Sequence, residues 1–226
     1  TRKIREENVD AISLNSDFYK TLSTKSNISY GTEYIYNKVG SAGHSENIRT
    51  DATERIDSRY PDGSKWQTLA AYLSHKYKPN SNLTLQSGIR YNYVTISADL
   101  SANNTFFNLP FKMANLKTSA LTGTFGLSWN PNTTFLWKLN ATTAFRAPNI
   151  DDIGKIFESE PGLVVVPNSN LQPEYAYGGE LGLTVNLNES ITFDTSTYYT
   201  YLDNSLVRKN FTVHGISEME YDGELS

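Results

Sequence analysis

The sequence predicts an all-β fold, an antiparallel up-and-down transmembrane β-barrel of which about eight strands are present. Three observations support this: apolar and polar residues alternate over long stretches, short polar turns alternate with long polar connections, and the chain is rich in tyrosine. A period of two indicates a strand with two different faces. The expected strands are residues 9–22, 28–36, 66–77, 83–95, 121–129, 134–146, 171–187 and 191–201.

Residues 134–146 show the alternation most clearly. One face carries Phe135, Trp137, Leu139, Ala141, Thr143 and Phe145, and the other carries Thr134, Leu136, Lys138, Asn140, Thr142, Ala144 and Arg146. Residues 9–22 follow the pattern less cleanly. Residues 66–77 fit it in two registers, so their apolar face is left open.

The connections also alternate. Short polar turns are expected near residues 24–27, 78–82, 130–132 and 188–190, because Asn, Ser and Pro favour turns. Longer polar connections are expected at about 41–64, 97–118 and 147–170. Outer-membrane barrels have this layout, with short turns in the periplasm and long loops outside the cell.

Strand length separates a membrane barrel from a soluble β-sandwich, which also alternates apolar and polar residues. Soluble strands usually have about 5–6 residues, whereas a tilted strand needs roughly 9–11 to cross the hydrocarbon layer. Several expected strands are longer than that. Aromatic residues near their ends suit the membrane interface: Trp129, Trp137, Tyr175, Tyr177, Tyr199 and Tyr201.

A spanning sheet has to close, because every backbone polar group in lipid needs a partner. Eight strands close a barrel whose interior is filled by side chains. The expected inner faces carry glycine and short polar residues, which suits a wider barrel. We therefore expect residues 1–226 to be part of one barrel domain whose remaining strands lie outside this chain.

Composition excludes several other classes. The chain has no cysteine, which rules out disulfides and thiolate zinc sites. The net charge of −4 and the lack of a basic stripe argue against nucleic acid as a partner. No apolar run reaches the roughly 18 residues of a transmembrane helix. The first residues lack a signal-peptide core, so an export signal would lie upstream, and both termini are interpreted as cut.

Two motifs carry a family resemblance. The first is Phe145-Arg146-Ala147-Pro148; the second is Asn168-Ser169-Asn170-Leu171, followed by Pro173 and Glu174. They resemble the FRAP and NPNL-like boxes in the C-terminal half of TonB-dependent outer-membrane receptors, with Ser169 where that family usually has proline. The resemblance covers roughly residues 28–210.

The resemblance implies a 22-stranded barrel in the outer membrane, around a plug that is absent from this chain together with the TonB box. It implies import of an iron chelate, haem, cobalamin or another scarce nutrient, with energy from TonB. The implied partners are the TonB complex through the missing plug, the small-molecule chelate and outer-membrane lipid. Haem importers of the family place a histidine between the two boxes; residues 149–167 have none, which leaves His44 as an alternative.

Candidate binding residues lie beside these boxes. Arg146 either meets an anionic chelate or pairs with Glu174 or Glu180 across adjacent strands. Asp151, Asp152, Glu158 and Glu160 form an acidic segment that binds substrate, binds Ca²⁺, or is only a solvated surface. Pro148 and Pro173 end strand pairing, because proline cannot donate to the ladder.

No catalytic role is expected. The sequence has neither a GxSxG nor an HExxH motif, and His44, His75 and His214 lack metal-ligand spacing. We therefore expect no catalytic residue, no bound metal and no cofactor. The leading function is active import. The alternatives are a channel or adhesin that is not energised, which the absence of a plug and TonB box in the full gene would favour, and an outer-membrane hydrolase with carboxylates at the rim.

Overall fold

The structure is a computed structural model. It describes residues 1–107, 112–155, 157–160, 163–165, 168, 171–207, 212, 215, 220–221 and 224–225. For residues 157–160, 163–165, 220–221 and 224–225 it describes the backbone only.

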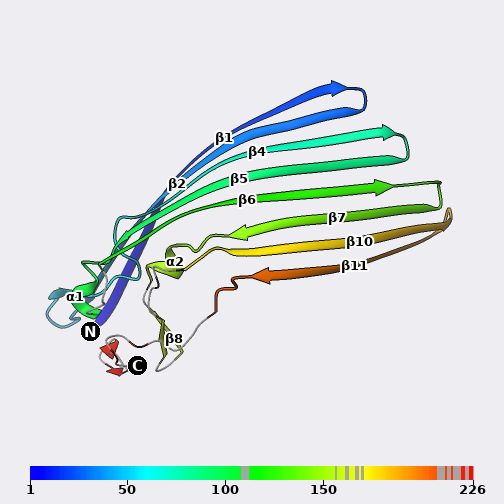
Figure 1. Cartoon of the computed structure of the whole chain (residues 1–226). Coiled ribbons are helices and arrows are strands. Elements are labelled where there is room, and N and C mark those ends of the chain that lie inside the picture. The colour runs from blue at the N-terminus through cyan, green and yellow to red at the C-terminus, as the bar shows by residue number, and fades with distance from the viewer. Residues whose placement is uncertain are drawn as a thin grey trace.

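Eight long strands form one antiparallel sheet in which each strand pairs with the next one along the chain (Figure 1). This confirms the predicted up-and-down order. The sheet is open, since within the described residues β1 pairs only with β2, and β11 only with β10. The strands are β1 (Arg2–Ser23), β2 (Ser26–Glu46), β4 (Ser64–Asn80), β5 (Leu83–Asp99), β6 (Met113–Trp129), β7 (Phe135–Arg146), β10 (Glu174–Asn188) and β11 (Ile191–Asp203).

The remaining elements are small. A short strand, β3 (Thr53–Arg55), pairs with the end of β2. The helices are α1 (Asn104–Phe107) and α2 (Ile150–Ile153), and the small hairpins pair β8 (Phe157–Glu160) with β9 (Leu163–Val165) and β12 (Glu220–Tyr221) with β13 (Glu224–Leu225). Among the described residues, no helix has the length and apolar character needed to span a membrane.

Tight turns lie at one end of the sheet and long connections at the other (Figure 1). In three of the four turns an asparagine side chain accepts a hydrogen bond from a backbone N–H that follows it. Asn80 Oδ1 accepts from Asn82 N at 3.0 Å, and Asn188 Oδ1 accepts from Ser190 N at 2.9 Å. The first two long connections are shorter than predicted, because β2 continues to Glu46 and β6 begins at Met113.

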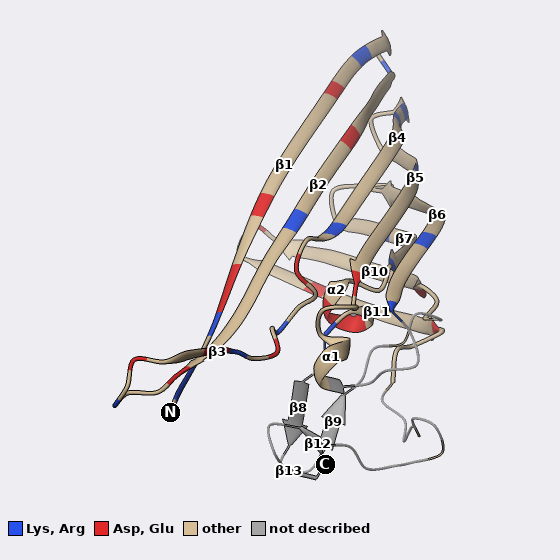
Figure 2. Ribbon diagram, turned by 90° about the vertical axis from the view of Figure 1, so that its left-hand side faces the viewer, with Lys and Arg blue, Asp and Glu red and all other residues tan. Residues whose placement is uncertain are grey.

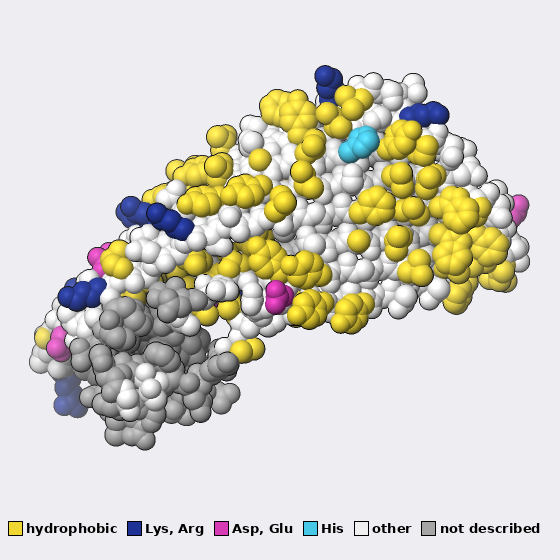
Figure 3. Space-filling view, viewed as in Figure 1, with side chains coloured by type: hydrophobic (Ala, Val, Ile, Leu, Met, Phe, Trp, Pro, Cys, Tyr) yellow, Lys and Arg dark blue, Asp and Glu magenta, His cyan; other side chains and the backbone are white. Residues whose placement is uncertain are grey.

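One face of the sheet, here called the outer face, is apolar along most of its length. Neighbouring strands bring its side chains into lateral rows, such as Tyr30, Leu73 and Ile89, and Leu127, Leu139 and Leu181. Hydrophobic side chains cover much of the face that Figure 3 displays, and lysine and arginine lie mainly at its margins. Ile89, within this apolar face, is 56% exposed.

The register of β4, which the sequence left open, is settled by its pairing. Leu69 and Leu73 lie opposite Tyr34 and Tyr30 on the outer face, so Trp66 and Tyr72 point to the other side. Trp66 is partly buried against a core cluster on that side.

The opposite, inner face carries paired polar groups at mid-height. Arg90 Nη2 lies 2.6 Å from Glu33 Oε1, and Arg90 Nε donates to Asn92 Oδ1 at 2.8 Å. The Tyr72 hydroxyl donates to Asp17 Oδ1 at 2.5 Å. Such pairing offsets the cost of removing polar groups from bulk water, and it gives the sheet a polar wall opposite its apolar one.

An apolar cluster covers the inner face at the loop end. It joins side chains of β5 and β6 to residues from two connections: Val94, Ile96, Ala98, Leu100, Ala114, Leu116, Ile150 and Ile153. In Figure 2 the helix α2, which carries Ile150 and Ile153, lies within the curve of the sheet. The long connections therefore fold back over the inner face.

Candidate functional site at the loop end of the sheet

The helix α2 is fixed at its start by a capping box. Asn149 Oδ1 accepts from Asp152 N at 3.0 Å, and Asp152 Oδ2 accepts from Asn149 N at 2.9 Å. This exchange satisfies two N–H groups that the first turn of a helix leaves without partners. Pro148, just before it, is fully buried. The segment between the two boxes therefore begins as a defined turn of helix.

Arg146 joins this helix to the sheet. Its Nη2 donates to both Asp152 carboxylate oxygens, at 3.1 and 2.9 Å, and its Nη1 donates to Glu174 Oε2 at 2.9 Å. The predicted cross-strand pairing of Arg146 with Glu174 is thus confirmed, whereas Glu180 accepts from Asn140 Nδ2 at 3.3 Å. The planar guanidinium suits two carboxylates at once.

Glu174 also contacts a segment that lies further along the chain. Its second oxygen, Oε1, accepts from the backbone N–H of Leu206 at 2.6 Å. Leu206 follows the end of β11, so one carboxylate ties the start of β10 to the segment beyond the next strand.

Asp151 belongs to a separate cluster. Its Oδ1 accepts from the Tyr60 hydroxyl at 2.9 Å and lies 3.2 Å from Lys155 Nζ, which sits 5.6 Å from the centre of the Tyr60 ring. Burial, and then the hydrogen bond to Asp151, raise the pKa of Tyr60 to about 12. Tyr60 thus remains a neutral donor at physiological pH.

Contacts between the first two long connections complete the assembly. The Ser58 hydroxyl donates to Asn103 Oδ1 at 3.0 Å, and Asn103 Nδ2 donates to the Ser58 carbonyl at 3.1 Å, in a buried position. Arg5 Nη2 pairs with Asp57 Oδ1 at 2.8 Å. Sequence analysis missed these residues, since partners 45 and 52 positions apart leave no local signal.

The predicted binding residues therefore separate into groups. Arg146 and Asp152 come together, whereas Asp151 faces Tyr60 and Lys155. Glu158 lies in β8, and its side chain, like that of Glu160, is outside the described structure.

The residues of the two boxes that the structure describes have mainly structural roles. Phe145, Ala147 and Leu171 pack against the apolar cluster. Pro173 immediately precedes β10 and Asn168 is exposed, while Asn170 lies outside the described residues. As predicted, the pairing of β7 with β10 ends at Arg146 and Glu174, so that Pro148 and Pro173 lie just outside it.

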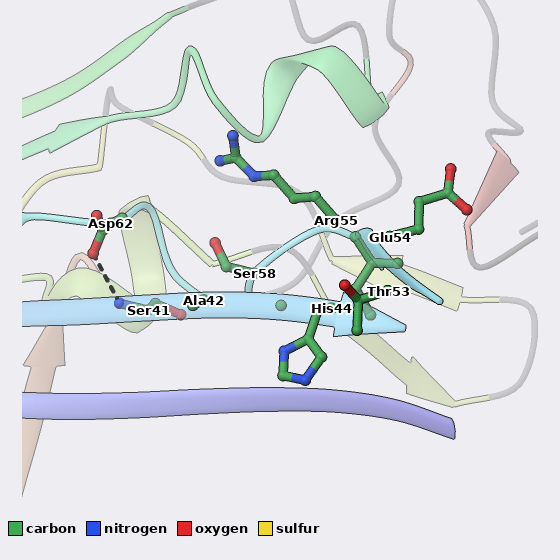
Figure 4. Close-up of a pocket in the computed structure, with 10 residues that line it drawn as sticks. Ser41, Ala42, His44, Thr53, Glu54, Arg55, Ser58 and Asp62 are labelled. Atoms are coloured by element: carbon green, nitrogen blue, oxygen red, sulfur yellow. Dashed lines mark hydrogen bonds between the residues drawn. The ribbon is translucent and has the colours of Figure 1, made fainter. Parts of the chain in front are cut away.

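A shallow pocket of about 400 Å³ lies between the end of β2 and residues 53–62 (Figure 4). Its lining mixes polar and apolar surface in similar amounts. Within it, Asp62 Oδ1 accepts from Ser41 N at 3.0 Å. His44, the predicted alternative haem ligand, lies in β2 with its ring toward β1. Among the described residues, no three His, Cys, Asp or Glu side chains gather as a metal site.

Chemically, the described cluster is a set of ion pairs and caps that hold α2 over the inner face. Each carboxylate of α2 already has a cationic partner. A ligand could bind Arg146, Asp151 or Asp152 only by displacing these partners.

Comparison with known proteins agrees with this architecture. Residues 3–218 match the family model described as "TonB dependent receptor-like, beta-barrel". No curated protein sequence matches the chain.

Solved structures share the fold at low identity. The copper transporter OprC is 12% identical with a TM-score of 0.68 and covers 88% of this chain. The haemophore receptor HasR of Serratia marcescens, solved with its haemophore HasA and haem, is 15% identical with a TM-score of 0.65 and covers 90%. The ferric yersiniabactin receptor FyuA of Yersinia pestis is 13% identical, with a TM-score of 0.53 and 88% coverage. The chain spans only 31%, 34% and 29% of these structures, respectively.

Proposed function

Because the chain belongs to the family of TonB-dependent receptor β-barrels, we propose that it forms part of the wall of an outer-membrane receptor that actively imports a scarce nutrient. The observation that carries the proposal is the family match over residues 3–218, which takes in nearly all of the sheet. In this proposal residues 1–226 are one part of a single barrel domain, and the plug and TonB box belong to the rest of the protein.

The two faces of the sheet support this placement. Exposed apolar side chains such as Leu69, Ile89 and Leu121 suit contact with lipid. The inner face carries Glu33, Arg90 and other paired polar groups that suit a wet interior. The turns then face the periplasm, and the long connections face the outside of the cell.

The connections supply the first contact with the nutrient. They fold over the inner face through α2 and the apolar cluster, so a ligand that enters the barrel passes them. Arg146, Asp151, Asp152 and Glu158 are the proposed ligand-binding residues. Since Arg146 and the two aspartates are already ion-paired, capture of a charged chelate would loosen α2 from the strand ends.

The proposed substrate class is a metal chelate, haem or cobalamin. The structural relatives include proteins whose names state copper, haem, iron and ferric yersiniabactin as cargo. Their low identity supports the fold and leaves the choice within this class to experiment. We propose no enzymatic role.

Growth of a strain lacking the full-length gene tests the proposal. On media with one defined source of iron, haem or cobalamin, the strain should lose growth on one source and regain it with the gene restored. Inactivating TonB should produce the same defect. Uptake that persists without TonB would contradict the energised importer and favour the passive channel, and growth on every source would contradict nutrient import.

A further inference from the structure

Three lysines gather on the outer face where its apolar band ends toward the long connections. Lys38 of β2 and Lys65 of β4 are direct cross-strand partners. Lys117 lies on the same face of β6, beyond β5. All three side chains are exposed, and together they are called here the lysine patch.

The register places Lys38 and Lys65 side by side, an arrangement that costs stability because like charges repel. In the part of the chain that the structure describes, no patch lysine has an ion-pair partner. Asp10 lies opposite Lys38 on the same face, but the two are not within ion-pair distance. Asp99, beside Lys65 on the next strand, instead accepts from Ser101 N at 2.9 Å. The patch thus presents cations that an external anion can neutralise.

Polar groups fill the space between the lysines. Ser97 is the cross-strand partner of Lys65, and Thr95 is the partner of Lys117. Lys65 and Lys117 are separated by one intervening strand, which sets them about 10 Å apart across the sheet. Hydroxyl donors between separated ammonium groups suit a headgroup with several phosphate oxygens.

The surface next to the patch is apolar and aromatic. Tyr36 is two residues from Lys38 on the same face, and Tyr93 is two residues from Thr95. Beyond them toward the turns lie Leu69 and Leu121, which are 54% and 65% exposed. In Figure 3, basic side chains border the hydrophobic area on the side toward the long connections.

We infer that the lysine patch is a binding site for an anionic, phosphate-bearing lipid, whose headgroup contacts the three lysines and whose acyl chains lie on the adjoining apolar surface. Two observations support this inference. The three lysines have no ion-pair partner among the described residues, and they border an exposed apolar surface that suits acyl chains. Basic clusters next to a membrane attract anionic headgroups in this way. The inference rests on the proposed placement of the outer face in the membrane.

Native mass spectrometry of the full-length protein in mild detergent tests the site. The protein is titrated with phosphatidylglycerol, with phosphatidylcholine, or with phosphatidylglycerol plus inorganic phosphate at the concentration of the lipid. The wild type should retain phosphatidylglycerol over phosphatidylcholine. The triple variant Lys38→Gln, Lys65→Gln, Lys117→Gln should bind it roughly tenfold or more weakly, as expected for the loss of three membrane-facing cations.

Two further variants keep the test decisive. Lys20→Gln, Lys25→Gln, Lys78→Gln removes the same charge at the turn end and should bind like the wild type. Replacing the three patch lysines with arginine keeps the charge and should preserve binding. The lipid site is overturned if the glutamine variant of the patch binds phosphatidylglycerol like the wild type, or if the turn-end control loses as much binding as that variant. It is also overturned if the arginine variant loses binding, or if inorganic phosphate at the concentration of the lipid displaces phosphatidylglycerol.

The growth test separates this inference from the proposed function. A strain that imports its nutrient normally, while the purified protein shows no lysine-dependent lipid preference, overturns the lipid site alone. A protein that binds lipid through the patch but supports no uptake overturns the importer alone.

Discussion

Arg146 and Glu174 lie directly opposite each other, as the last residue of β7 and the first of β10, with 2.9 Å between Nη1 and Oε2. The same guanidinium also holds Asp152 of α2. The connection between the two strands is therefore fixed where it leaves the sheet, by a cation that two carboxylates share.

Replacing Arg146 with glutamine should release α2 while leaving the sheet intact. Arg146 is 49% exposed, so the loss in global stability should be small, on the order of 1 kcal/mol. Hydrogen exchange in residues 147–155 should rise, and limited proteolysis should cut there first. Arg59→Gln is the matched control, since Arg59 is similarly exposed and lies 3.7 Å from Glu7. Equal protection of α2 in both variants would contradict the anchoring role.

Whether a contact could be predicted from the sequence depends on how far apart its two residues lie in the chain. The pairing of Arg146 with Glu174 was among the predicted alternatives, because a connection between neighbouring antiparallel strands brings its two ends together. The contact of Tyr60 with Asp151 joins residues 91 positions apart and depends on how two connections fold over the sheet. Nothing local in the sequence encodes it.

The register of β4 shows the same limit within a strand. Trp66 and Tyr72 are large aromatics on the inner face, so both faces of this strand look apolar in sequence. Trp66 packs against the cluster that includes Ile150 and Ile153, and Tyr72 reaches Asp17. Alternation identifies an outer face only where no connection folds back to bury the inner one.

Gly31 leaves room for Tyr72, and a methyl group there should be harmful. A Cβ at Gly31 would lie 2.3 Å from the Ser16 carbonyl oxygen and 2.9 Å from both Asp17 Oδ1 and Tyr72 Cε1. Gly31→Ala should therefore destabilise the barrel by about 1–3 kcal/mol, typical of overpacking. The measurement is urea unfolding of the full-length protein in detergent.

Gly179→Ala is the matched control, because a Cβ at Gly179 meets no atom within 4 Å. It should unfold at the wild-type urea concentration or slightly above it. If the two alanine variants unfold at the same urea concentration, the close contact between Tyr72 and Gly31 does not limit the stability of the fold.

Ile153 should matter most for the docking of α2. It is fully buried in the apolar cluster, and truncating such a side chain typically costs about 2–5 kcal/mol. Because the cluster joins connections to the sheet surface, Ile153→Ala should loosen residues 147–155 before the strands. Hydrogen exchange by mass spectrometry resolves the two regions.

Ile48→Ala provides the comparison, since Ile48 is a loop isoleucine that is 69% exposed. This variant should exchange like the wild type in both regions. Should Ile153→Ala leave α2 as protected as Ile48→Ala does, the apolar cluster would not be what holds the connection on the inner face.

The hydrogen bond between Tyr60 and Asp151 should persist far into the alkaline range. The pKa of Tyr60 is raised from 10.0 to about 12, first by burial and then by the Asp151 carboxylate. A folded-state pKa above the unfolded value means that the stabilisation is complete below about pH 10 and is lost as the pH rises through about 12.

Tyrosinate absorbance should thus contain a late-titrating component that Tyr60→Phe removes. Asp151→Asn should shift this component to lower pH without returning it to 10.0, since burial is the larger cause. A component unaffected by Tyr60→Phe, or one that Asp151→Asn returns fully to the ordinary value, would show that the connection does not bury this hydroxyl against α2.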